Sequence, residues 1–328
     1  MGIYEQLSSL DNVSINYSAG GAINIILALV MYGVALGIQP SQFKKVFAQP
    51  KSIILGLCGQ WILLPALTYL IIVIFNKYIP PMVAMGMILV ASCPGGNISN
   101  FMTSFSKGNI ELSVSMTAVS TCMAPIITPG NYAIWGSLYK TFLCNHEIVD
   151  ANTWLTIPFW NVFETVFILL GIPLVLGLLT TRFLPKVAKV LSTPLRYISI
   201  VIFVTMVLVM FWSNRQQFVD YIKYIFIIVL VHNALALATG NTVARLGHLP
   251  VRDRRALTIE VGIQNSGLGL LLLFNPNIFP QEGIGGMLFV TAWWGVWHIV
   301  SGLTVATIFR KSKITSSPSD GSSVAKAA

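Results

Sequence analysis

The sequence predicts an all-α polytopic membrane protein with about nine transmembrane helices. Of its 328 residues, 55% are hydrophobic and only 9% are charged, whereas about a quarter of the residues in a soluble protein are charged. This composition excludes a soluble globular domain. Nine apolar stretches approach or exceed the length of about 20 residues that crosses a bilayer as a helix. They are 22–38, 53–76, 82–105, 110–135, 159–181, 197–213, 221–243, 256–274 and 284–309.

The basic residues predict how these stretches are oriented. Sixteen of the twenty Lys and Arg residues fall in alternate connections, and the other set of connections holds only Lys77, Lys140, Arg215 and Lys223. Short cytoplasmic loops are enriched in Lys and Arg. We therefore expect a multi-pass protein of the cell membrane (plasma or inner), with its N-terminus outside and its C-terminus in the cytoplasm.

The net charge of +9 does not indicate a nucleic-acid partner, because such binding needs a basic face on a folded domain. The lipid bilayer is the expected surrounding, and no obligate protein partner is evident. We expect a polar, exposed tail outside the cell at 1–20 and a transporter domain at 21–310. A Ser-rich, disordered cytoplasmic tail is expected at 311–328, where apolar residues are too few to form a core.

Two of the apolar stretches are interrupted in mid-span. The third contains Ser-Cys-Pro-Gly-Gly-Asn-Ile-Ser-Asn at 92–100, and the eighth contains Glu-Val-Gly-Ile-Gln-Asn-Ser-Gly at 260–267. Pro94 blocks the helical hydrogen-bond ladder, and the glycines allow backbone conformations that other residues resist. Broken backbone is tolerated at membrane depth only where protein or a wet cavity surrounds it. Both interruptions should therefore face the interior.

The positions of the interruptions indicate a transporter. They lie five stretches apart, and the loop charges orient them in opposite directions, as expected for corresponding elements of an inverted repeat. The repeats would be about 21–135 and 197–310, with a linking helix at about 159–181. Discontinuous helices at such places mark binding sites near the bilayer midplane. Their free amide groups favour an anion, and their free carbonyls suit a hard cation such as sodium.

Glu260 is the strongest single candidate for a functional residue. A carboxylate in mid-span costs at least about 2.5 kcal/mol on insertion scales. Hydroxyls and amides around it would form either a cation site or purely structural hydrogen bonds between helices. Ser113 and Thr117 lie four residues apart on one helix face, although each could instead bond a carbonyl of its own helix. Gln60 is similarly open to either interpretation.

The motifs at both interruptions resemble those of the bile acid:sodium symporter family. The resemblance includes Cys-Pro-Gly-Gly-Asn-Ile-Ser-Asn at 93–100, Gly-Asn at 108–109 with Leu-Ser-Val-Ser-Met-Thr at 112–117, and Glu-Val-Gly-Ile-Gln-Asn at 260–265. It extends from about 24 to 309 and includes Gly59-Gln60, Pro65 and His232-Asn233. The chain resembles the nine-helix arrangement, without the additional N-terminal helix of ten-helix bacterial members.

The resemblance implies panel and core domains, with two crossing discontinuous helices in the core, and a symporter that imports an organic anion. The anion would be a bile acid or a smaller carboxylate such as pantoate. Two co-transported sodium ions would share Glu260. The first site would comprise Ser99, Asn100, Ser113, Thr117 and Glu260, and the second Gln60, Glu260, Val261, Ile263 and Gln264.

The same resemblance assigns the anion to Asn97 and Asn265, with His298 as a weaker candidate. His298 lies among Trp293, Trp294 and Trp297 and could equally be a buried or interfacial histidine. Ile299 follows it, where some bacterial relatives carry Asn, and this departure weakens the assignment of a substrate.

Other functions are less well supported. The sequence has no convincing pair of acids, zinc motif or Ser-His-acid arrangement, so we expect no enzyme. The alternative is a proton-coupled or arsenite-type permease of similar architecture, in which Glu260 carries a proton and Cys93 or Cys122 binds the metalloid. The oxygen-rich surroundings of Glu260 disfavour this alternative, and a lone thiol is a weak soft-ion site.

Overall fold

The computed structural model describes residues 3–8, 10, 22–39, 50–143, 159–213, 215–279 and 282–312, and these residues form helices joined by turns, with one isolated β-bridge. Each of the nine predicted stretches coincides with a helix or with consecutive helices, so the predicted all-helical polytopic architecture is confirmed. The elements are α2 Ala22–Leu36, α4 Pro50–Cys58, η2 Gly59–Leu63, α5 Leu64–Ile74, α6 Pro81–Ser92, α7 Ile98–Phe105, α8 Ile110–Phe142, α9 Phe159–Val166, η4 Phe167–Gly171, α10 Ile172–Phe183, α11 Pro185–Ser213, α12 Arg215–Leu246, α13 Val251–Gly262, α14 Ser266–Leu273 and α15 Gly285–Lys311.

The helices are long and apolar enough for a membrane. Among the described residues, five continuous helical spans meet both criteria, and two shorter apolar helices accompany them. Large apolar side chains stay exposed along α10 and α11, including Leu176, Val201 and Trp212. Such continuous apolar surface is unfavourable in water, so these faces are suited to contact with lipid.

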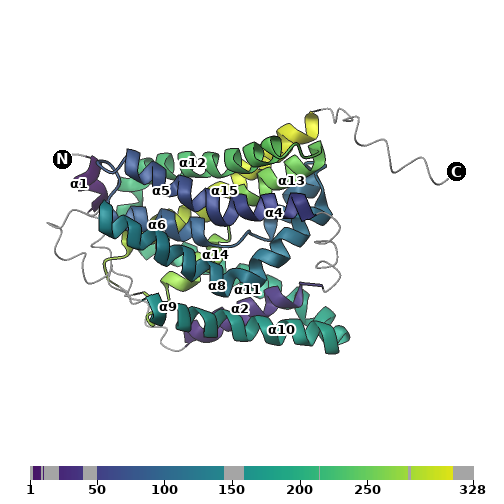
Figure 1. The fold of residues 1–328 in the computed structure, drawn as a ribbon. Coiled ribbons are helices and arrows are strands. Elements are labelled where there is room, and N and C mark those ends of the chain that lie inside the picture. Colours follow the sequence, from purple (N-terminus) through teal and green to yellow (C-terminus); the bar gives the residue numbers. More distant parts are fainter. Residues whose placement is uncertain are drawn as a thin grey trace.

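The helices α2, α10 and α11 pack on one another along one side of the molecule. Figure 1 shows α2 and α10 along the lower edge, with α12, α13 and α15 on the opposite side. Small residues allow the close approach. A Cβ on Gly177 of α10 would lie 2.4 Å from the Cβ of Ala35, and one on Gly33 of α2 would lie 2.9 Å from the Cβ of Leu195. This group matches the expected panel.

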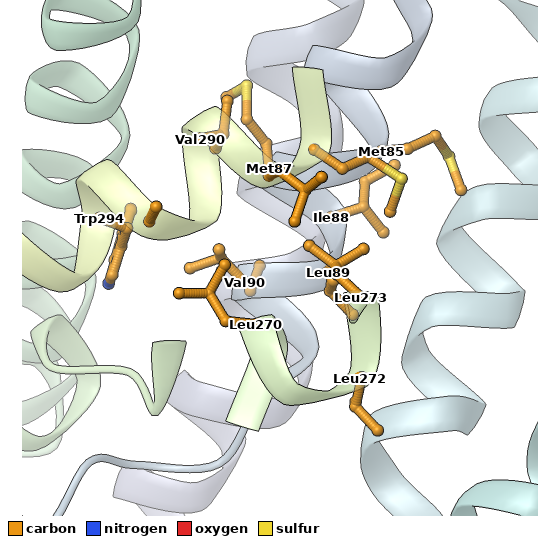
Figure 2. Packing of buried hydrophobic residues seen from close by; sticks show 14 of the residues in the cluster. Met85, Met87, Ile88, Leu89, Val90, Leu270, Leu272, Leu273, Val290 and Trp294 are labelled. Carbon is orange, nitrogen blue, oxygen red and sulfur yellow. The ribbon is translucent and has the colours of Figure 1, made fainter. Parts of the chain in front are cut away.

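The main apolar core forms where α6, α14 and α15 meet. Figure 2 shows Leu89 and Val90 of α6 together with Leu270 of α14 and Trp294 of α15, and all four side chains are buried. The backbones of α6 and α15 approach closely, because a Cβ on Gly86 would lie 2.8 Å from the Cα of Met287. Dense packing of this kind resists changes in volume and holds the first broken helix against the rest of the core.

The N-terminal segment departs from the expected exposed tail. Residues Ile3–Ser8 form the short helix α1, which lies against α6 and α12. Leu7 and Leu10 are fully buried in the main core cluster. The expectation rested on polar composition, whereas two leucines spaced by three residues provide one apolar side that can be buried. Residues 11–20, and 313–328 of the expected C-terminal tail, lie outside the described residues.

Hydrogen bonds show that the connections gather at two ends of the molecule. At one end, the amide of Asn109 donates to the carbonyl of Arg252 at 3.0 Å, and Ser52 donates to the Asp253 carboxylate at 2.6 Å. At the other end, Asn275 donates to the Asn24 side chain at 2.7 Å. Which end faces the cytoplasm stays a prediction.

Candidate functional site

The two interrupted stretches form a matching pair of broken helices. The first consists of α6, with 12 residues, and α7, with 8. The second consists of α13, with 12 residues, and α14, with 8. Both begin after an extended proline, Pro80 or Pro250. The equal lengths place the two interruptions at the same depth in each element.

The two breaks are joined by backbone hydrogen bonds. Gly95 and Gln264 form an antiparallel β-bridge. The amide of Gly96 donates to the carbonyl of Ile263 at 2.8 Å, and the amide of Asn265 donates to the carbonyl of Pro94 at 2.8 Å. These bonds satisfy backbone groups that lipid could not. They also bring the predicted residues of both breaks together at one place.

Glu260, near the end of α13, lies where the two breaks meet. Its side chain is fully buried and accepts hydrogen bonds from Ser99 at 2.6 Å, Ser113 at 2.8 Å and Thr117 at 2.5 Å. The structure thus gathers around Glu260 residues from α7, α8 and α13. Within the described part of the chain, its hydrogen-bond partners are these neutral hydroxyls, and no Lys, Arg or His pairs with the carboxylate.

The oxygen atoms around Glu260 include more hydrogen-bond acceptors than hydroxyl protons that could be donated to them. Ser113 also lies 2.8 Å from Oδ1 of Asn100, and Thr117 lies 3.4 Å from the same atom and 3.0 Å from its own helix carbonyl. A hydroxyl has a single proton to donate, so Ser113 and Thr117 cannot serve all of these acceptors at once. A small cation would satisfy the remaining lone pairs.

The carbonyls beside Glu260 are capped in the structure. The carbonyl of Glu260 accepts from Nε2 of Gln60 at 3.3 Å, and that of Val261 accepts from Nε2 of Gln264 at 2.9 Å. The carbonyl of Ile263 accepts from Gly96, as described above. Two carbonyls predicted as sodium ligands therefore have hydrogen-bond donors, which an incoming cation would have to displace or share.

The two glutamines leave their oxygens available. Oε1 of Gln60 and Oε1 of Gln264 are buried and have no hydrogen-bond partner. A buried, unpaired oxygen is costly, and such atoms are rare in native structures. Gln60 lies in η2, a π-helical turn of a kind that is frequent at functional sites. These two oxygens fit the ligand chemistry of a hard cation.

Gly95 allows the first break to approach the carboxylate. A Cβ at this position would lie 2.7 Å from Oε1 of Glu260 and 3.0 Å from Nε2 of Gln60. Any larger residue would collide with both groups. Gly95 thus lies against both the Glu260 carboxylate and the Gln60 side-chain amide.

Comparisons with known proteins agree with this geometry. The family model described as "Sodium Bile acid symporter family" matches residues 24–221. The chain belongs to this family. It is 32% identical over 290 residues to the "Uncharacterized sodium-dependent transporter YocS" of Bacillus subtilis, which covers 88% of this chain and 83% of the relative.

More distant relatives of the family are found in plants and mammals. A protein of Arabidopsis thaliana named as a probable chloroplastic sodium/metabolite cotransporter is 27% identical, over 87% of this chain and 66% of its own length. The "Sodium-dependent organic anion transporter" of Bos taurus is 25% identical, over 94% of this chain and 77% of its own length. The chain therefore spans slightly less than two thirds of the plant relative.

The residues predicted to contact an anion occupy different settings in this family member. Asn97 is exposed at the start of α7, and its side chain makes no capping bond there. Asn265 is half-buried, and its Oδ1 caps α14 by accepting from the amide of Leu268 at 3.0 Å. Both therefore lie at the N-terminus of a half-helix. His298 is buried on α15.

The two thiols that the permease alternative would use, Cys93 and Cys122, lie in different parts of the structure. Cys93 is buried at the first break beside Gly269, whereas Cys122 packs with Ala35 and Leu174 near the panel. Among the described residues, no group of three or more His, Cys, Asp and Glu side chains could hold a metal ion. Neither thiol is paired with the oxygen cluster around Glu260.

Sequence reasoning missed the role of Asn233 at this site. Asn233 is fully buried on α12, and its Nδ2 donates to the carbonyl of Gly262 at 2.8 Å. The available signal was the polar pair His232-Asn233 in the middle of an apolar stretch. In the sequence this pair stood out only as part of the family resemblance.

Proposed function

We propose that the protein is a sodium-coupled symporter that imports an organic anion by alternating access, with two sodium ions sharing Glu260. The observation that carries the proposal is the fully buried Glu260 carboxylate, surrounded by neutral hydroxyls at the meeting point of two broken helices. An intramembrane carboxylate without a basic partner needs compensation, and a transported cation supplies it.

The first sodium ion would bind among the acceptor oxygens around Glu260 that have no hydroxyl proton available to them. Its proposed ligands are Ser99, Asn100, Ser113, Thr117 and Glu260. When the cation arrives, the hydroxyl protons can turn outward while their oxygens face the ion, because a hydroxyl is both donor and acceptor. This site joins α7, α8 and α13, so occupancy by sodium would hold both broken helices together.

The second sodium ion would bind on the other side of Glu260. Its proposed ligands are the unpaired side-chain oxygens of Gln60 and Gln264, the carboxylate, and the carbonyls of Val261 and Ile263. In the structure the glutamine nitrogens cap nearby carbonyls. Binding would therefore require a local exchange of hydrogen bonds for oxygen–cation contacts.

The anion would bind beside the breaks, between panel and core. Asn97 and Asn265 stand at the starts of α7 and α14, where the helix dipole favours negative charge. His298 is the third proposed contact. Bile acids and smaller carboxylates such as pantoate share the carboxylate that this arrangement would recognise.

Coupling follows from linkage between the sites. A ligand shifts the inward and outward states only through differential affinity, so sodium must stabilise the geometry that binds the anion. By reciprocity the anion must then tighten sodium binding. If two sodium ions accompany one monoanion, one net positive charge enters, and each 100 mV of inside-negative potential contributes about 2.3 kcal/mol.

The remaining assignments complete this proposal. The protein would act in the plasma or inner membrane with its N-terminus outside and its C-terminus in the cytoplasm. The repeats 21–135 and 197–310, linked at about 159–181, would form the transporter domain 21–310.

The test is uptake of a labelled bile acid and of labelled pantoate into proteoliposomes with an inward sodium gradient. A matched potassium gradient and an inward proton gradient serve as controls. Sodium-dependent accumulation of either anion supports the proposal. Uptake driven by protons without sodium would contradict it and favour the permease alternative.

A further inference from the structure

The end of α13 has three consecutive carbonyls capped by three side-chain amides. An α-helix leaves its last four carbonyls without helical partners. In α13 the carbonyls of 260, 261 and 262 accept from Gln60 at 3.3 Å, Gln264 at 2.9 Å and Asn233 at 2.8 Å, respectively. The three amides thus stand in equivalent chemical positions along one helix end.

The three amides differ in what their oxygens do. The side-chain oxygens of Gln60 and Gln264 have no partner, and the proposed function assigns both to a cation. The oxygen of Asn233 instead accepts from the hydroxyl of Ser301 on α15 at 2.5 Å. Asn233 is therefore held at both ends of its amide, whereas the glutamines are free to exchange partners when an ion binds.

The helix that carries Asn233 lies closely against α13. A Cβ on Gly240 of α12 would lie 2.4 Å from the carbonyl oxygen of Leu257, and one on Gly262 would lie 2.3 Å from Cδ2 of Leu237. The two helices run antiparallel with almost no space between them. Asn233 thus reaches the break from a helix whose position relative to α13 is fixed by packing.

We propose that Asn233 is a positioning residue for the second sodium site, acting through the carbonyl of Gly262. The inference rests on the proposed function, and it adds a residue that would not contact the ion. By holding the Gly262 carbonyl, the amide of Asn233 fixes the peptide between the two ligand carbonyls of Val261 and Ile263.

The physical reason is the freedom of the backbone at this point. Gly262 lacks a Cβ, so its peptide can rotate more readily than any other. Ile263 has already left the helix, with φ −112° and ψ 96°. Without Asn233, the Gly262 carbonyl would lose its buried donor and could turn toward another partner, which would turn the flanking carbonyls with it. Preorganised ligands bind more tightly because less ordering is needed on binding.

The experiment is a sodium titration of thermal stability on the purified full-length protein, with potassium replacing sodium at constant ionic strength. The variants are Asn233→Ala and Asn233→Leu. The second keeps the buried volume while removing the amide, which guards against a failure to fold. Thr239→Ala is the matched control, because Thr239 lies on the same helix and its hydroxyl donates to the carbonyl of Leu235 in that helix at 2.8 Å.

The inference predicts that both Asn233 variants require about tenfold more sodium for half-maximal stabilisation, the effect of leaving one buried polar group unpaired. Their maximal stabilisation should return at saturating sodium, and Thr239→Ala should titrate like the native protein. A lower melting temperature with an unchanged sodium requirement would mean that Asn233 is merely structural and would overturn the inference. The native protein and Glu260→Gln separate this outcome from failure of the proposed function. That failure would leave the native protein without a sodium response, or would leave Glu260→Gln with the native response.

Discussion

The two broken helices have the same construction but different chemistry. Each has 12 residues before its break and 8 after it, and each donates one backbone amide to the other. The first break contributes glycines and the neutral hydroxyl of Ser99. The second contributes the carboxylate of Glu260 and a row of capped carbonyls. The symmetric part provides the scaffold, and the asymmetric part places one charge at the centre of the molecule.

This difference explains why one carboxylate can serve both proposed ions. A second acid at the corresponding place in the first break would double the desolvation cost of burying charge. It would also place two like charges together at the crossing, which raises the energy of both ionised forms. Neutral oxygens on the first break avoid this repulsion and still provide ligands. Substitutions that remove the asymmetry should therefore weaken sodium binding more than they lower the stability of the fold.

The largest effect is expected from Glu260→Gln. The substitution keeps the size of the side chain but removes the only charge within the oxygen cluster, so a cation would no longer be compensated. We expect sodium-driven uptake to be lost, measured as accumulation in proteoliposomes with an inward sodium gradient. Glu164→Gln is the control, because Glu164 is an exposed acid on α9. Normal sodium-driven uptake by Glu260→Gln would show that the carboxylate is not needed.

The next largest effect compares glycines of the two breaks. In Gly95→Ala the new methyl group would lie 2.7 Å from Oε1 of Glu260, whereas in Gly262→Ala it would lie 2.3 Å from Cδ2 and 2.6 Å from Cγ of Leu237. We expect Gly95→Ala to raise the sodium concentration for half-maximal uptake by at least about tenfold, the order of one lost buried hydrogen bond. Gly262→Ala should lower the melting temperature and change the sodium requirement less than Gly95→Ala does, because its methyl group meets Leu237 and not the carboxylate. Equal sodium requirements in the two variants would remove the proposed distinction between the breaks.

A smaller effect is expected from single hydroxyls around the carboxylate. Ser113→Ala or Thr117→Val removes one oxygen of the first proposed site, and each should weaken sodium binding by about three- to tenfold, as for the net contribution of one typical hydrogen bond. Ser115→Ala is the matched control, since its buried hydroxyl donates to the carbonyl of Glu111 at 2.7 Å. Sodium binding to purified protein measures the change. The site-1 assignment fails if Ser115→Ala weakens binding as much as Thr117→Val does.

The smallest effect on sodium is expected at the two asparagines of the breaks. Asn265→Ala loses the cap of α14 and should cost about 1 kcal/mol of stability, seen as a lower melting temperature. Asn97 makes no capping bond, so Asn97→Ala should leave stability unchanged. Both variants should raise the anion concentration for half-maximal uptake at saturating sodium. An unaltered anion requirement in both would move the anion site away from the helix starts.

Much of this arrangement could be predicted from the sequence. Apolar length located the spans, and Pro94 with its glycines located the first break, because both signals are local. The sequence suggested Ser99, Ser113 and Thr117 as oxygens around the buried acid Glu260, but the division of the ligands into two ion sites came only from the family resemblance, since contacts between distant segments have no local signature. The capped carbonyls and the two hydrogen bonds of the Asn233 side chain depend on the directions of individual amides, which composition and periodicity do not encode. The burial of Leu7 was not predicted because the N-terminal segment is polar on average and only its two leucines form the buried side.

The most direct test of the central claim is a binding measurement with radioactive sodium on the purified protein, which counts ions without assuming a substrate. We expect two sodium ions per native chain, one in Thr117→Val at a concentration that saturates only the second site, and none in Glu260→Gln. Positive cooperativity between the two ions is expected, because both stabilise the same joined arrangement of the breaks. Sodium binding that persists in Glu260→Gln with native stoichiometry would contradict the claim that this carboxylate is the shared centre of coupling.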